Sequence, residues 1–152
     1  AMSALDLTLG LISTHLGLSA RLDVEGLFLH GEPPVGMPRE GRVVRDPLVQ
    51  KALNMMRENM ESPLKLPILA KRLTCQPRTL DRHFRRALGA PPGEVYRHLR
   101  LSMARKLLEG TALDLIEIAL RCGYESPAAL SRAITRLYGM PPKRLRYQDE
   151  AK

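Results

Sequence analysis

Arginines recur at helical spacing in the stretch QPRTLDRHFRRALGAPP, residues 76–92. Arg78, Arg82, Arg85 and Arg86 fall largely on one face of a predicted helix, whereas the opposite face is apolar. A guanidinium can bind phosphate oxygens, or guanine O6 and N7, through two parallel N–H groups. The stretch therefore indicates a helix that packs through one side and offers the other to a polyanion such as nucleic acid.

A second stretch, SPAALSRAITRLYGMPP at residues 126–142, repeats this frame with a different polar surface. An ungapped alignment of residues 68–92 with residues 118–142 gives eight identities: Ile68/Ile118, Pro77/Pro127, Leu80/Leu130, Arg82/Arg132, Arg86/Arg136, Gly89/Gly139, Pro91/Pro141 and Pro92/Pro142. The predicted outward positions of the second copy are Ala128, Ser131, Arg132, Thr135 and Arg136. The residues that the two copies share are mostly those expected to form the helices and their packing, and the residues that differ are mostly those expected to be exposed. This pattern is expected for two surfaces that contact adjacent, non-identical stretches of DNA.

Each copy has the pattern of a helix-turn-helix. A short helix is followed by a predicted three-residue turn, LTC in the first copy and GYE in the second. The second helix then begins at a proline and ends at a glycine. Proline at the first helical position lacks only an N–H that has no partner there, and glycine tolerates the left-handed conformation that ends many helices. Two copies are too few for a solenoid, so the sequence predicts two helix-turn-helix units.

The elements that position these units are all predicted to be helical. No segment shows strand alternation bounded by hairpin turns. Asp46 and Pro47 predict the start of a helix that ends near Pro63. Further helices are predicted over residues 66–72, 77–88, 92–109, 114–122 and 126–138, with a short one after Pro141. The predicted fold class is all-α.

The predicted helix over residues 92–109 would connect the two units rigidly. Its inward side chains are predicted to be Val95, Leu99, Met103 and Leu107, and its mostly outward ones Arg97, Arg100, Arg105 and Lys106. At about 1.5 Å per residue this helix spans about 26 Å. Such a length would hold two recognition helices near one turn of duplex DNA apart, about 34 Å.

The charge of the chain changes sign near residue 42. Residues 1–41 hold 2 basic and 5 acidic side chains, a net −3, which leaves 22 basic and 11 acidic residues, a net +11, in the remainder of a chain whose total is +8. Short helices are predicted over residues 3–16 and 19–28, and the Gly- and Pro-rich residues 30–41 are predicted to form a linker. We therefore divide the chain into residues 1–41 and a polyanion-binding domain at residues 42–152.

Patterns of catalysis and metal binding do not occur in the sequence. The 4 histidines are scattered, there is no nucleophile elbow or phosphate loop, and Cys75 and Cys122 lack partners at metal-ligand spacing. His83 is predicted to be a surface or turn-packing residue rather than a general base. No apolar run of about 18 residues and no secretory signal is found. We expect no enzyme activity, no metal, no cofactor and no membrane partner, and a cytoplasmic location.

From Arg45 to Arg146 the sequence resembles the AraC/XylS family of bacterial transcription regulators. The segments that carry the resemblance are LAKRLTCQPRTLDRHFRRALGAPPGEVYRHLRLSMARKLL and LIEIALRCGYESPAALSRAITRLYGMPPKRLR. It implies a seven-helix domain whose two recognition helices enter successive major grooves of double-stranded DNA. The implied base-reading residues are Arg78, Asp81, Arg82, Ala128, Ala129, Ser131 and Arg132. Phosphate contacts are expected from Arg85, Arg86, Thr135, Arg136 and Lys143.

The sequence departs from the family pattern at a few positions. Ile134 stands where an aromatic residue is usual, and Leu145 stands where the family often has tyrosine before its terminal arginine. Both replacements are apolar and should preserve packing. Ala128 and Ala129 cannot form side-chain hydrogen bonds, so the second recognition helix is expected to read less sequence or to rely on DNA shape.

Residues before the linker resemble, more loosely, the last helices of the amidotransferase-like (PfpI-type) sensor domain found in one branch of the family. This resemblance implies that a small-molecule effector acts through a sensor domain missing from this chain, in pathways such as amino-acid or amine catabolism. It also allows a homodimer through residues 1–30. The alternative function is an RNA-binding or protein-interaction module, although an aromatic content of 4% disfavours stacking on unpaired bases.

Overall fold

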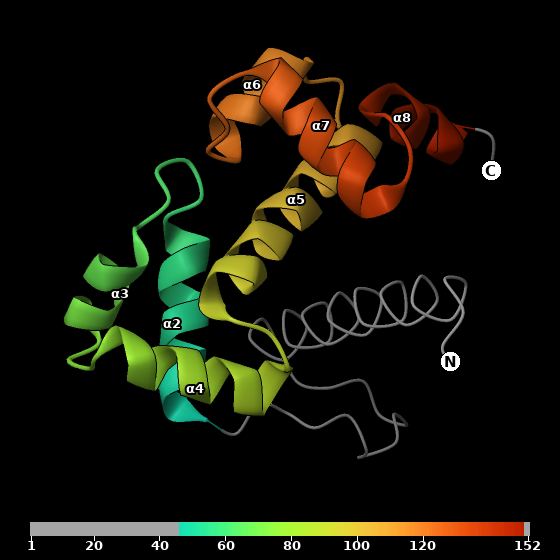
Figure 1. Ribbon diagram of the computed structural model, residues 1–152. Helices are drawn as coiled ribbons and strands as arrows, with labels where there is room; N and C mark the ends of the chain where they lie inside the picture. The colour runs from blue at the N-terminus through green and yellow to red at the C-terminus, as the bar shows by residue number, and fades with distance from the viewer. Residues whose placement is uncertain (1–45, 151–152) are drawn as a thin grey trace, which may run out of the picture.

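The computed structural model describes residues 46–150, which form seven helices and no strand (Figure 1). The first unit contains α2 (Pro47–Glu58), α3 (Leu66–Arg72) and α4 (Pro77–Leu88). The long α5 (Pro92–Gly110) leads to a second unit of α6 (Leu115–Arg121), α7 (Pro127–Tyr138) and α8 (Pro142–Glu150). The predicted all-α fold with two helix-turn-helix units joined by a long helix is confirmed. The predictions for residues 1–41, including the short helices, the linker and the dimer segment, lie outside the described residues.

Local sequence signals set most helix ends. Asp46 caps α2 by accepting hydrogen bonds from the backbone N–H groups of Leu48 and Val49, and Ser126 caps α7 by accepting one from Ala129. At their C-terminal ends α4 and α7 stop at Gly89 and Gly139, whose φ values of 73° and 74° are left-handed. One predicted end was wrong, because α2 ends at Glu58 rather than near Pro63. Asn59 stops it, and its side-chain amide donates to the Met55 carbonyl at 2.8 Å.

The two units have separate hydrophobic cores, and α5 contributes to both. The first core includes Leu53, Leu80 and Phe84 together with Val95 and Leu99 from the N-terminal half of α5. The second core contains Leu101, Ala104 and Leu108 from the C-terminal half of α5, with Ile118, Leu130, Ile134 and Leu145. Leu145 and Ile134 are each at most 1% exposed, so the apolar replacements do pack as expected. Because α5 serves two cores, its buried side changes along its length.

This change of face corrects the predicted orientation of Arg100. Arg100 does not point outward: its Nε and Nη2 donate at 2.7 Å to the carbonyls of Cys122 and Gly123, in the turn of the second unit. Its guanidinium also lies 4.4 Å from the centre of the Tyr124 ring. The inward prediction was incomplete as well, since Met103 and Leu107 are only partly buried whereas Leu101, Ala104 and Leu108 are buried.

The ungapped repeat alignment is also wrong in its first half. The recognition helices α4 and α7 are related by 50 residues, but the preceding helices end at Arg72 and Arg121, which are 49 apart. The left-handed turn residues Thr74 (φ 55°) and Gly123 (φ 75°) are 49 apart too. Buried Leu69 therefore corresponds to buried Ile118, and Ile68, paired with Ile118 by the sequence, is 44% exposed. Four residues (73–76) separate the helices of the first unit and five (122–126) those of the second, in place of the predicted three-residue turns.

The turn of the second unit also touches the first unit. Gly123 lies so close to the segment after α2 that a Cβ there would collide with the Met60 carbonyl and approach Pro63 Cδ to 2.7 Å. Tyr96 holds the same segment, because its hydroxyl donates to the Asn59 carbonyl and accepts from the Leu64 N–H. Figure 1 shows this loop reaching towards α6. The two units are thus fixed against each other at a contact that only a glycine allows.

Candidate nucleic-acid interface

The outer face of α4 carries the arginines singled out in the sequence. Arg78, Arg82, Arg85 and Arg86 are exposed, while Leu80, Phe84 and Leu88 on the opposite face are buried. Asp81 is partly buried and pairs with Arg85, whose Nε lies 2.8 Å from Asp81 Oδ2. The Arg85 and Asp81 side chains are 61% and 43% exposed, so this ion pair stabilises the free protein little and can open to a ligand.

His83 packs against the start of α2 from the recognition helix. Its Nδ1 lies 2.7 Å from Asp46 Oδ2, and both side chains are partly buried. Burial alone would raise the pKa of the Asp46 carboxyl, but the hydrogen bonds from His83 and from the α2 backbone lower it overall. His83 was predicted to be a surface or turn-packing residue; it is partly buried and packs on the N-terminal cap of α2, and this specific partner was not evident in the sequence.

On α7 the predicted site residues line the surface that faces away from the second core. Ala128, Arg132, Thr135 and Arg136 are exposed, and Ala129 and Ser131 are partly buried. The Thr135 hydroxyl donates to the Ser131 carbonyl at 2.8 Å. Its oxygen can still accept a hydrogen bond, and the hydroxyl can rotate to donate to a ligand instead. The polar content of this face is lower than that of α4, as the sequence indicated.

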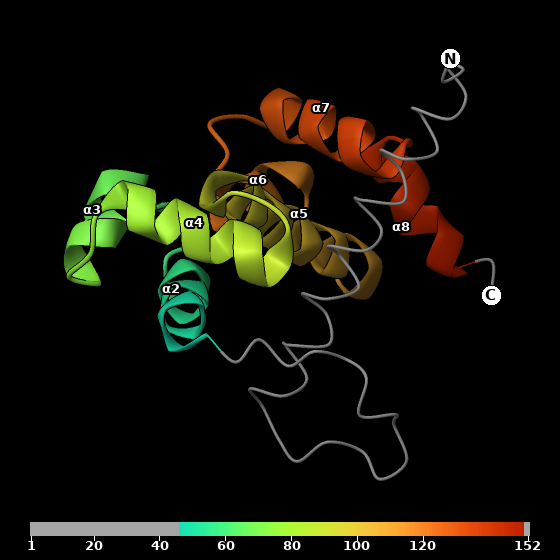
Figure 2. The ribbon, with the colours of Figure 1, turned by 60° about the horizontal axis from the view of Figure 1, so that its bottom comes forward.

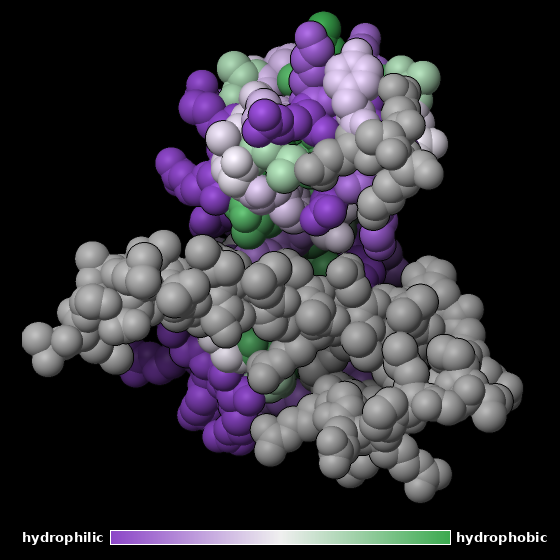
Figure 3. Space-filling view, turned by 90° about the vertical axis from the view of Figure 1, so that its right-hand side faces the viewer, coloured by the Kyte–Doolittle hydropathy of each residue, from purple (hydrophilic) through white to green (hydrophobic). Residues whose placement is uncertain are grey.

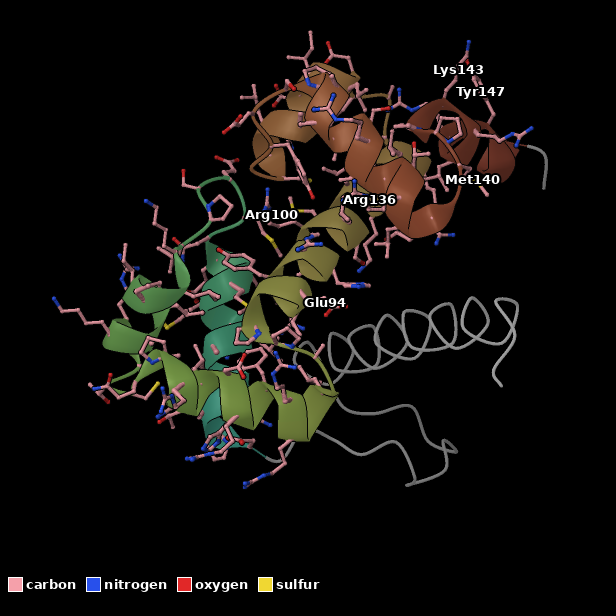
Figure 4. All side chains as sticks on the ribbon, in the orientation of Figure 1. Glu94, Arg100, Arg136, Met140, Lys143 and Tyr147 are labelled. Atoms are coloured by element: carbon pink, nitrogen blue, oxygen red, sulfur yellow. The ribbon has the colours of Figure 1, made fainter. Side chains whose placement is uncertain are left out.

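Lys143 lies apart from the other predicted residues. It is exposed near the start of α8, and Figure 4 shows it at the outer edge of the second unit, away from Arg136. Arg146, on the same helix, is turned inward and donates to the carbonyls of Leu108 and Leu113. Arg146 therefore anchors α8 to the last turn of α5 and to the loop that follows it.

The two recognition helices, α4 and α7, are oriented similarly in the molecule. In Figures 1 and 2 the N-terminal ends of α4 and α7 lie towards the same side of the molecule, with α5 between the units. The side view in Figure 3 shows hydrophilic side chains over much of the surface of both units that is not covered by grey atoms. Two exposed, basic helices on one rigid frame can contact an extended polyanion at two places.

A cavity of about 540 Å³ opens between α5 and α7. Figure 4 shows Glu94 and Arg100 on α5 and Arg136 on α7 around this region. Burial raises the pKa of Tyr124 on its wall, with Arg100 and Arg97 acting in the opposite direction. Burial also raises the pKa of the adjoining Cys122 thiol to about 11, against the attraction of Arg100, so this thiol stays protonated at neutral pH. Arg97 was not among the predicted site residues.

Neither a metal-binding cluster nor a membrane-spanning helix occurs among the described residues. Residues 46–150 contain no group of three or more His, Cys, Asp or Glu side chains arranged to hold a metal ion. In the same part of the chain, every helix is too short or too polar to cross a membrane.

Known proteins share both the sequence pattern and this architecture. The helix-turn-helix domain family matches residues 69–148. Over 151 residues the chain is 32% identical to the HTH-type transcriptional regulator GlxA of Rhizobium meliloti, covering 95% of this chain and 47% of that protein. It is also 32% identical over 154 residues to the HTH-type transcriptional regulator ArgR of Pseudomonas aeruginosa, covering 97% and 46%. The chain thus spans about half the length of these relatives.

The fold has been seen bound to its ligand in a similar protein. The crystal structure of the DNA-binding domain of AdpA, a global transcriptional factor, in complex with a target DNA superposes with a TM-score of 0.64 at 32% identity, covering 70% of this chain and 95% of that one. The likeness extends over both helix-turn-helix units, since it covers more of this chain than either unit contains.

Proposed function

The chain belongs to the AraC/XylS family of helix-turn-helix transcription regulators, and we propose that it binds double-stranded DNA sequence-specifically by placing α4 and α7 in adjacent segments of the major groove. AdpA, which shares the fold, has been crystallised with a target DNA. The relatives GlxA and ArgR are transcriptional regulators. The net charge of +11 in residues 42–152 suits a polyanion.

The observation that carries this proposal is the opposed pair of faces on both recognition helices. Phe84 and Ile134 are 0% exposed, while Arg82 and Arg132 on the other sides of the same helices are exposed. A helix that packs through one side leaves the other free to enter the major groove, which is wide enough for an α-helix. Two such helices joined by α5 suit two neighbouring segments of one duplex.

The predicted residues take two roles in this proposal. Base contacts come from Arg78, Asp81, Arg82, Ala128, Ala129, Ser131 and Arg132. Phosphate contacts come from Arg85, Arg86, Thr135, Arg136 and Lys143. The exposure of all of these residues except the partly buried Asp81, Ala129 and Ser131 supports the assignments. Lys143 is the least supported because of its separate position. Since Ala128 and Ala129 offer only methyl groups, α7 would contribute less hydrogen-bonded readout than α4.

Control of the whole protein is part of the same proposal. Because GlxA and ArgR are about twice as long as this chain, we infer that an effector acts through a sensor domain outside residues 42–152. The two alignments cover nearly all of the chain, which supports assigning residues 1–41 to the end of such a domain. A homodimer through residues 1–30 and a role in amino-acid or amine catabolism remain expectations from the resemblance.

Selection from a random pool of duplex DNA tests the proposal directly. We expect an enriched site with two unequal blocks spaced about one helical turn apart, the stronger block belonging to α4. Binding to duplex RNA of matching sequence, measured over a salt series, should be far weaker. Equal affinity for RNA, or enrichment of no sequence at all, would instead favour the RNA-binding or protein-interaction alternative.

A further inference from the structure

The cavity between α5 and α7 is lined by more positive than negative charge. Arg97 and Arg100 come from α5 and Arg136 from α7, together with the buried His98, and Glu94 is the carboxylate among the lining residues. Figure 4 shows Glu94, Arg100 and Arg136 grouped around the junction of the two units. Such a concentration of guanidinium groups indicates an oxyanion as the natural ligand.

The three arginines are not equally available to a ligand. Arg100 is already committed to the carbonyls of Cys122 and Gly123 and to the Tyr124 ring. Arg97 and Arg136 are exposed, and within residues 46–150 neither forms an ion pair. Glu94 is likewise in no ion pair with a described residue. The cavity therefore holds two guanidinium groups whose charge is not used by the fold.

The position of the cavity relates it to the proposed DNA-binding face. Arg136 follows Arg132 by four residues, about one helical turn, so both project from the same side of α7. Arg97 comes from the half of α5 that packs on the first unit. The cavity therefore lies between α5 and α7, and its edge at Arg136 adjoins the face of α7 that is proposed to contact DNA.

We propose that Arg97 and Arg136 together bind a backbone phosphate in the stretch of DNA that lies between the segments read by α4 and α7. This inference rests on the proposed function and adds a third contact point, to which the connecting helix α5 contributes Arg97. The bound group is a phosphodiester of DNA, although free phosphate shares its chemistry. Glu94 opposes this contact electrostatically and limits its strength.

A phosphate scan locates the contact. The selected two-block DNA is prepared with single neutral methylphosphonates at each position between the blocks, and affinity is measured for the full 152-residue chain. We expect one or two adjacent positions where neutralisation weakens binding by about fivefold at 0.15 M salt, the effect of one contact with a salt slope of about 0.9. Arg97→Gln and Arg136→Gln should each reduce the effect at these positions, and the double variant should abolish it.

A matched charge change on the same helix serves as the control. Lys106 is exposed on α5, nine residues after Arg97 and so about two and a half turns away, on the opposite side of the helix. Lys106→Gln should leave the scan and the salt slope unchanged, whereas Arg97→Gln should make the slope shallower by about 0.9. Glu94→Gln should strengthen binding, a gain that damage to the fold cannot produce.

The outcomes separate this inference from the proposed function. If the wild-type chain selects a DNA site but Arg97→Gln and Arg136→Gln behave like Lys106→Gln, the phosphate contact is disproved and the two-helix proposal stands. If the chain selects no site, both are overturned. Calorimetry with inorganic phosphate alone is the third arm: micromolar binding that both variants abolish, together with a flat DNA scan, would assign the cavity to a free anion and overturn the assignment to DNA.

Discussion

Asp46 joins the start of α2 to the recognition helix α4 through His83. One carboxylate oxygen of Asp46 accepts hydrogen bonds from the Leu48 and Val49 N–H groups at 3.0 and 3.4 Å, and the other lies 2.7 Å from His83 Nδ1. His83 is the neighbour of Arg82 in the sequence. The orientation of the helix proposed to read DNA therefore depends on the residue at which the described domain begins.

Replacing Asp46 with Asn should change how stability depends on acid pH. Asn still caps α2 but carries no charge for His83, so we expect a loss of about 1 kcal/mol at pH 5. The folded-state pKa of Asp46 is lowered, so its stabilisation is present above its ordinary pKa of about 3.9 and is lost as pH falls through the lower value. Urea unfolding at pH 5, 4 and 3 should show that the difference in unfolding free energy between the wild-type protein and Asp46→Asn decreases as the pH falls. A difference that stays constant would contradict this.

Gly123→Ala should be more damaging than Gly139→Ala. Both glycines have φ near 75°, so both replacements incur backbone strain of about 1–2 kcal/mol. Only at Gly123 would the new Cβ also collide with the Met60 carbonyl, since open space surrounds the one at Gly139. Gly123→Ala should therefore have an unfolding free energy, measured in urea, that is lower than that of Gly139→Ala by at least about 1 kcal/mol.

The same pair tests whether the contact between units matters for DNA. Gly123→Ala should weaken binding to the selected two-block site more than binding to its stronger block alone, because the relative position of the units shifts. Gly139→Ala should weaken both by similar factors. Equal behaviour of the two variants would show that Gly123 does not fix the units.

Arg82→Ala and Arg86→Ala should have different effects on specificity. If Arg82 contacts a base, its loss should cost about 1–3 kcal/mol and relax the preference at one position of the selected site. If Arg86 contacts a phosphate, its loss should weaken binding evenly and reduce the salt slope by about 1. Repeating the selection with each variant distinguishes them, and an unchanged preference for Arg82→Ala would remove its base-reading role.

Phe84→Ala should destabilise the first unit selectively. Phe84 is 0% exposed in the first core, and such truncations cost about 3–5 kcal/mol. Hydrogen exchange should show lost protection in α2–α4 and retained protection in α6 and α7, because the second core does not include Phe84. Ile134→Ala should give the reverse pattern. Equal loss throughout residues 46–147 in either variant would mean that the two cores unfold as one.

The sequence by itself determined the helices and their exposed faces. Proline and glycine placed α4 and α7 correctly, because both residues act on backbone groups within one helical turn. The spacing of Leu80 and Phe84 against Arg82 separated the buried and exposed faces for a similarly local reason. The residues on those faces could be identified without knowing what packs beside them.

Tertiary structure alone decided how the two units are joined. The contacts of Asp46 with His83 and of Arg100 with Cys122 link residues 37 and 22 positions apart, and no local pattern specifies such pairs.

The 49-residue offset between α3 and α6, the first helices of the two helix-turn-helix units, was hidden in the sequence by chance identities such as Ile68 with Ile118. In α5, adjacent burial of His98, Leu99 and Leu101 is a signal that more than one face is covered. Which arginine turns inward depends on the packing of two separate cores around one helix, and that packing is a property of the whole fold.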